Sequence, residues 1–308
     1  SFTRSASWEM SINSPNPAYP VTTLADGVQF YTHSCWTPDG TGVMFTSEWN
    51  PDETHIRIAN ADGSGTRPLL SEAGVAYAGP TLAQGPHGTQ LIFTKDSDPN
   101  LASPNLYSVA VADDGELLAQ LEDAVQLTDI PDAQIYNPHC SRDGDKIAFV
   151  RTLNWTDSDI YVLQAANDIY SNSERIVTSY FDPLMLPVSE TANVSGTPAV
   201  SPDGRIVYFT EDISGNYNLD ITSGQAWLDK FPNTNFELFY ADISAGAPIT
   251  PVRIFSDVSN QGVLSASPDG TILSFVDDST RDGDAEPDGN LFLGALVKAE
   301  LAPPAVET

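Results

Sequence analysis

Basic residues are scarce in this chain. Its 308 residues include 13 Lys and Arg against 42 Asp and Glu, so the formal net charge is −29 and the pI is about 4.1. A surface this negative repels phosphate backbones and anionic lipid headgroups, which excludes nucleic acid or membrane binding through a basic patch. The counter-ligands that such a surface favours are cations.

Long apolar runs are also missing. No segment approaches the roughly 18 consecutive apolar residues of a membrane span, so no membrane insertion is expected. The chain begins Ser1-Phe2-Thr3, with neither an initiator Met nor a basic leader, as a trimmed exported protein or a shortened chain would. We therefore expect a secreted protein, either extracellular or periplasmic.

Cysteine is nearly absent. Cys35 and Cys140 are too few for a disulfide framework and lack the CxxC spacing of a zinc site. The hydrophobic fraction of 41%, with 5 Trp, 11 Tyr and 13 Phe, is enough for a core, and charged residues at 18% are too few for a disordered polyanion. The composition therefore indicates a globular protein.

One turn motif recurs along the chain. Its five copies are Thr37-Pro38-Asp39-Gly40, Gly85-Pro86-His87-Gly88, Ser141-Arg142-Asp143-Gly144, Ser201-Pro202-Asp203-Gly204 and Ser267-Pro268-Asp269-Gly270. Pro fixes φ at the first turn position, Asp caps the turn through its side chain, and Gly supplies the residue with positive φ. Each copy therefore predicts a hairpin turn, and a short apolar strand follows every one.

Further strands complete each unit. The predicted third strands are His55–Ala59, Asn105–Val111, Asp159–Leu163, Glu237–Ile243 and Asn290–Val297. The predicted fourth strands are Thr66–Leu70, Ala124–Thr128, Arg175–Thr178 and Pro251–Phe255. The fifth unit has none after it, but Tyr19–Leu24 precedes the first motif as these segments precede later ones.

This count predicts an all-β, five-bladed β-propeller with four-stranded antiparallel blades. The ring is closed by an N-terminal outer strand that joins the last blade, which leaves no open edge. The predicted organisation is an N-terminal extension over 1–18, the propeller over 19–297 and a C-terminal tail over 298–308.

The turns and the apolar strands after them resemble the PD40, or TolB-like, β-propeller repeat, a WD40-like repeat. The clearest copy is Ser201-Pro202-Asp203-Gly204-Arg205-Ile206-Val207-Tyr208-Phe209, and the second copy departs from the pattern at Gly85 and His87. The resemblance covers roughly residues 19–297 and implies the propeller fold. It implies little about function, because such repeats occur in translocation proteins, prolyl peptidases and some polysaccharide lyases. The chain has no Gly-x-Ser-x-Gly elbow of a peptidase.

Acidic loops collect on one predicted face of the ring. The richest carries alternating acids at Asp282, Asp284, Glu286 and Asp288, with Gly283 and Gly289 available for tight turns. Such a loop can direct several oxygens onto one Ca²⁺, although it matches an EF-hand loop only in part. The alternative is a solvated acidic hairpin loop, and the loop over 96–100 has the same character with fewer oxygens.

Residues counted back from each motif glycine should lie together on the innermost strands. The residues five positions before the motif glycines are Cys35, Ala83, His139, Ala199 and Ser265. In the first unit, the residue seven positions before the motif glycine is His33. His33, Cys35 and His139 could gather near the central channel around a transition metal, or line a polar channel filled with water. Cys140 falls one position later than Cys35, on the opposite strand face in a non-adjacent blade, so no disulfide is expected.

Catalytic signals are weak. The predicted inner strands contain no Asp or Glu, which argues against glycosidase chemistry by an inner-strand carboxylate pair. A lyase would need a base beside a cation, and His33, His139 and Tyr136 are the candidates for that alternative.

Three segments are predicted contact surfaces. The insertions over 179–196 and 211–235 are apolar for loops and contain Phe181, Trp227 and Phe231. The N-terminal extension carries Trp8 in an alternating pattern that suits strand addition. The alternatives are packing back over the blades for the insertions and disorder for the extension.

These observations favour a non-enzymatic exported propeller that binds proteins, including copies of itself, or surface glycans. Ca²⁺ would stabilise its acidic loop. The alternative is a polysaccharide-active, lyase-like enzyme with its site on the loop face.

Overall fold

A computed structural model provides the structure of the chain. It describes residues 34–47, 55–61, 64–86, 88–97, 103–130, 133–152, 158–165, 184–189, 195–213, 236–244, 249–254, 261–266, 272–277 and 290–295. Within these ranges nearly all regular structure is β-strand, and one short 3-10 helix covers Leu121–Asp123. The described residues include no helix long and apolar enough to cross a membrane.

The strands form five antiparallel sheets that follow one another along the chain. Blade 1 consists of β1 (Ser34–Trp36), β2 (Gly42–Ser47), β3 (His55–Asn60) and β4 (Arg67–Leu70). Blade 2 consists of β5 (Ala76–Gly85), β6 (Gly88–Asp96), β7 (Asn105–Ala110) and β8 (Val125–Gln126). Blade 3 consists of β9 (Gln134–Cys140), β10 (Lys146–Thr152), β11 (Ser158–Gln164) and β12 (Met185–Ser189).

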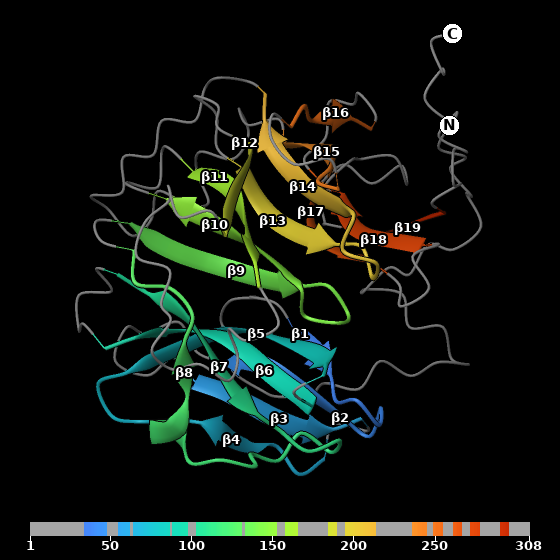
Figure 1. The fold of residues 1–308 in the computed structure, drawn as a ribbon. Coiled ribbons are helices and arrows are strands. Elements are labelled where there is room, and N and C mark those ends of the chain that lie inside the picture. The colour runs from blue at the N-terminus through green and yellow to red at the C-terminus, as the bar shows by residue number, and fades with distance from the viewer. Residues whose placement is uncertain are drawn as a thin grey trace, which may run out of the picture.

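Blade 4 consists of β13 (Ser195–Val200), β14 (Ile206–Asp212), β15 (Phe236–Asp242) and β16 (Val252–Arg253). A fifth sheet contains β17 (Gln261–Ala266), β18 (Ile272–Asp277) and β19 (Asn290–Ala295). The first strands of successive sheets pack on one another, β1 on β5, β5 on β9, β9 on β13 and β13 on β17. This arrangement is a β-propeller with the first strand of each blade innermost (Figure 1).

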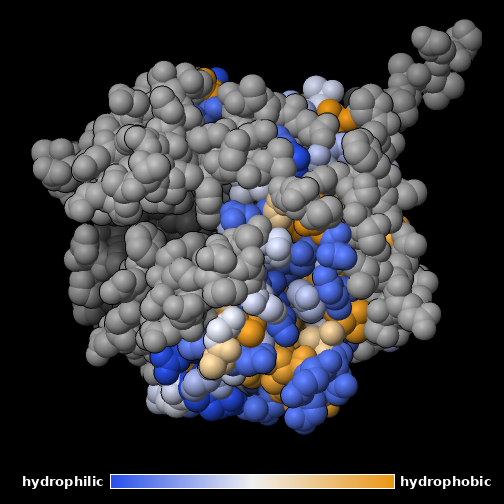
Figure 2. Space-filling model, turned by 90° about the vertical axis from the view of Figure 1, so that its left-hand side faces the viewer, coloured by the Kyte–Doolittle hydropathy of each residue, from blue (hydrophilic) through white to orange (hydrophobic). Residues whose placement is uncertain are grey.

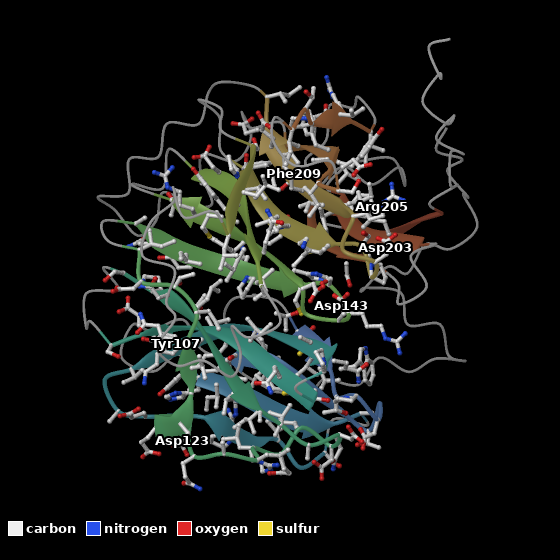
Figure 3. All side chains as sticks on the ribbon, in the orientation of Figure 1. Tyr107, Asp123, Asp143, Asp203, Arg205 and Phe209 are labelled. Atoms are coloured by element: carbon white, nitrogen blue, oxygen red, sulfur yellow. The ribbon has the colours of Figure 1, made fainter. Side chains whose placement is uncertain are left out.

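The turn motif builds the same hydrogen-bond network in blades 1, 3 and 4. In blade 4 the Ser201 hydroxyl donates to Asp203 Oδ1 at 2.6 Å and accepts from Ile206 N at 2.9 Å. Asp203 Oδ1 also accepts from Arg205 N at 3.2 Å. The motif glycines Gly40, Gly88, Gly144 and Gly204 all have positive φ. Asp143, Asp203 and Arg205 lie at the same end of their blades (Figure 3). The predicted turn chemistry is therefore confirmed in blades 1, 3 and 4, whereas the fifth copy, Ser267-Pro268-Asp269-Gly270, lies outside the described residues.

Blade 2 uses a tighter hairpin. Gly85 and Gly88 are paired across β5 and β6, whereas in blade 3 Ser141 N donates to Lys146 O, so that the motif closes a longer turn. The tight hairpin shifts the register of β5 by two residues. Thr81, opposite Ile92, is therefore the blade 2 counterpart of Cys35 and His139, and the prediction of Ala83 at this position is wrong.

The core lies between neighbouring blades. In blades 2, 3 and 4 the phenylalanine five residues after the motif glycine stacks on the third strand: Phe93 on Tyr107 at 6.1 Å, Phe149 on Tyr161 at 6.4 Å and Phe209 on Phe239 at 5.7 Å between ring centroids. Such pairs stabilise a sheet beyond their buried area. Phe209 lies within blade 4 and Tyr107 within blade 2 (Figure 3). Around them the aliphatic side chains of adjacent blades form continuous clusters.

One strand prediction is wrong. The strand that pairs with β11 is Met185–Ser189 and not Arg175–Thr178. Met185, Leu186 and Val188 are buried, so five residues of the segment interpreted as an insertion, Met185–Ser189, belong to the blade. Pro187 is compatible with this strand because an outermost strand has one edge free of partners.

The propeller class is confirmed, with an all-β chain and four-stranded antiparallel blades. The fifth sheet has three strands among the described residues. The predicted closing strand at Tyr19–Leu24, the N-terminal extension and the C-terminal tail lie outside them.

Candidate functional site

Several predicted site residues lie outside the described part of the chain. These are the calcium candidates Asp282, Asp284, Glu286 and Asp288, the contact candidates Trp8, Phe181, Trp227 and Phe231, and His33. They remain predictions. Within the described ranges no group of three or more His, Cys, Asp or Glu residues is placed to hold a metal ion.

The innermost strands carry a repeated β-bulge. Opposite the core phenylalanines stand the pairs Gly79-Pro80, Asn137-Pro138 and Thr197-Pro198, two residues against one. The first residue of each pair has positive φ, 64° at Gly79, 51° at Asn137 and 39° at Thr197. Positive φ is uncommon outside glycine and strained for a β-branched residue. A bulge re-aims the side chains of an edge strand.

The bulges also join the blades. Gly79 N donates to Thr46 Oγ1 of blade 1 at 3.0 Å, and a Cβ at Gly79 would lie 2.7 Å from Cδ of Pro138 in blade 3. In blade 4 the hydroxyls of Thr197 and Thr210 are 3.2 Å apart. The strained backbone of the inner strands is therefore held by contacts within and between blades.

His139 takes part in one of these contacts. Its Nδ1 accepts a hydrogen bond from Val200 N in blade 4 at 3.1 Å. An imidazole that accepts at Nδ1 is in the neutral tautomer with its proton on Nε2. One of its two nitrogens is therefore already used to hold blades 3 and 4 together.

Tyr136 is poorly suited to act as a base. Its hydroxyl donates to Gln134 Oε1 at 2.8 Å. Burial, and secondly the charge of Asp96, raise the pKa of Tyr136 well above its ordinary value of 10. The phenolate that a general base needs is therefore not populated at neutral pH.

The two cysteines approach blade 2 from opposite sides. Cys140 Sγ donates to Leu82 O at 2.9 Å and lies 3.4 Å from Thr81 Oγ1, while Cys35 belongs to the cluster between blades 1 and 2. Both thiols are free, in agreement with the prediction of no disulfide. Burial raises the pKa of Cys140 to about 12 and that of Cys35 further still, so both are poor nucleophiles. His33 being outside the described residues, the predicted metal site of His33, Cys35 and His139 stays untested.

A buried polar cluster lies between blades 3 and 4. Glu211 and Glu237 are cross-strand partners, and both side chains are buried. Arg253 donates to both carboxylate oxygens of Glu237, and the Ser189 hydroxyl of blade 3 donates to Glu211 Oε2 at 3.3 Å. Two adjacent carboxylates could serve acid–base chemistry, but these face a packed interface rather than solvent. Their contacts indicate a structural role.

The inner strands carry no carboxylate. Asp and Glu are absent from β1, β5, β9, β13 and β17, as the sequence predicted. The polar groups that these strands do carry are the side chains of Ser, Thr, Asn, Gln, Tyr, Trp, His and Cys and the backbone groups.

Comparison with known proteins finds similarity to solved structures at low sequence identity. No family model matches the chain, and no curated protein matches it. Among solved structures, a periplasmic gluconolactonase of Pseudomonas aeruginosa is 14% identical with a TM-score of 0.49, over 87% of this chain and 69% of the other. A protein described as a TolB of Agrobacterium tumefaciens is 14% identical with a TM-score of 0.48, over 86% of this chain and 83% of the other.

TolB of Acinetobacter baumannii is also 14% identical, with a TM-score of 0.45 over 86% of this chain. The chain spans 55% of the length of that TolB. At this identity the likeness concerns the fold, and the function has to be argued from the residues of the chain itself.

Proposed function

We propose that this chain is a non-enzymatic, exported propeller that binds proteins, including copies of itself, or surface glycans. The observation that carries the proposal is the contact between His139 Nδ1 and Val200 N at 3.1 Å. The side chain best suited to act as a base is held in an inter-blade hydrogen bond. Tyr136, with its raised pKa, is a poor substitute. Both facts support binding over catalysis.

The proposed ring has five blades. In support, the fifth sheet has three described strands where the other sheets have four, so that β19 is its outermost described strand. Tyr19–Leu24 would add the fourth strand beside β19 and close the ring. Closure of this kind removes an exposed strand edge and ties the two ends of the fold together.

Calcium is proposed at the loop of Asp282, Asp284, Glu286 and Asp288. The support is the presence of an acid at every second position of this loop and a net charge of −29. The ion would neutralise the loop between β18 and β19 and thereby stabilise the fifth sheet.

The proposed contact surfaces are the N-terminal extension with Trp8 and the insertions with Phe181, Trp227 and Phe231. Sedimentation of the full chain tests self-association. The proposal expects a mass above that of the monomer and its loss on deletion of residues 1–18. A monomer unaffected by the deletion would remove self-assembly.

Assays of glycan cleavage test the enzymatic alternative. The proposal expects binding without product release over a panel of neutral and acidic glycans. Product release that is lost in His139→Ala would replace the proposal by the lyase-like alternative.

A further inference from the structure

We draw no further inference here: the strongest candidate, the polar pocket that Asn60 and Arg67 of blade 1 line together with Asp114 and Glu116 of the loop after β7, carries nothing, because Arg67 and Glu116 already pair with each other there and no other feature of the described residues points to a ligand.

Discussion

Val200 N donates a hydrogen bond to Nδ1 of His139 at 3.1 Å, and this bond crosses from blade 4 to blade 3. Val200 is 1% exposed, so its N–H has little access to water as an alternative acceptor. This bond between the two blades therefore uses a side chain that the sequence offers as a candidate base only for the lyase-like alternative.

Replacing His139 should destabilise this interface. His139→Ala leaves a buried N–H without a partner, a loss of about 1–3 kcal/mol in the free energy of unfolding. Urea denaturation followed by circular dichroism measures it. Gln84→Ala, an exposed change on the innermost strand of blade 2, is the control and should leave the midpoint unchanged. Equal stability of the two variants would show that the hydrogen bond contributes nothing.

Gly79, in the β-bulge of blade 2, should not tolerate replacement by a residue with a side chain. Gly79 has φ of 64°, and a Cβ there would lie 2.7 Å from Cδ of the Pro138 ring. Gly79→Ala should destabilise the chain by about 1–3 kcal/mol through combined strain and overlap. Gly74→Ala is the matched control, because Gly74 has φ of 75° and no atom within 4 Å of an added Cβ. Thermal unfolding of both separates backbone strain from steric overlap, and a Gly79→Ala midpoint no lower than that of Gly74→Ala would refute the contact.

The hydrogen bonds within the motif turns should make the stability of the folded chain depend on pH. Partial burial acts to raise the pKa of Asp203, but the Ser201 hydroxyl, Arg205 N–H and the charge of Arg205 outweigh it, so the pKa lies below 3.8. A depressed pKa means that the carboxylate form is favoured by folding. Its contribution is present above pH 3.8 and is lost as pH falls through the folded value.

Ser201→Ala removes the hydroxyl that bonds Asp203 and Ile206 N, and should lower stability at pH 7 by about 1 kcal/mol. The difference from the unmodified chain should shrink below pH 3.8. Chemical denaturation at pH 7 and pH 3 measures both values. If the stability difference between Ser201→Ala and the unmodified chain is the same at pH 7 and pH 3, the lost stability comes from the hydrogen bond of Ile206 N alone.

Much of this fold can be predicted from local chemistry. Ser201, Asp203 and Gly204 sit close together in sequence, and each supplies a donor, an acceptor or a positive φ that the turn requires. Repetition of such turns sets the blade period. The motif Gly85-Pro86-His87-Gly88 lacks the Asp that caps the other turns, so the register counted from those turns does not hold in blade 2. Gly85 pairs with Gly88 there, and β5 is shifted by two residues relative to that count.

Contacts between blades were harder to predict, because they join residues far apart in sequence. The residues Met185–Ser189 lie within a segment whose sequence predicts an insertion. They form a strand because they pair with β11, and the pattern of residues within the segment does not predict this. On the face that Figure 2 shows, hydrophobic and hydrophilic residues are interspersed where described side chains are visible.

The buried thiol of Cys140 should be unreactive in the folded chain. Burial raises the pKa of Cys140 from 9.0 to about 12, so the thiolate is scarce at pH 8. A raised pKa means that folding favours the neutral thiol, and its contribution is present below pH 9 and lost as pH rises toward 12. Ellman's reagent at pH 8 should titrate both thiols at once in denaturant, whereas Cys140 should not react in the first minutes without it. Rapid reaction of both thiols in the native chain would contradict the burial of Cys140.

Removal of calcium tests the acidic loop. If Asp282, Asp284, Glu286 and Asp288 hold Ca²⁺, the ion stabilises the folded chain by mass action, about 2.7 kcal/mol at a concentration 100 times the dissociation constant. Differential scanning calorimetry should show a midpoint that rises with added Ca²⁺ and falls with chelator. Mg²⁺ serves as the ionic-strength control, since it prefers fewer protein ligands and retains its waters. Asp284→Asn with Asp288→Asn should abolish the response, and a midpoint that chelator leaves unchanged would reject a tight site.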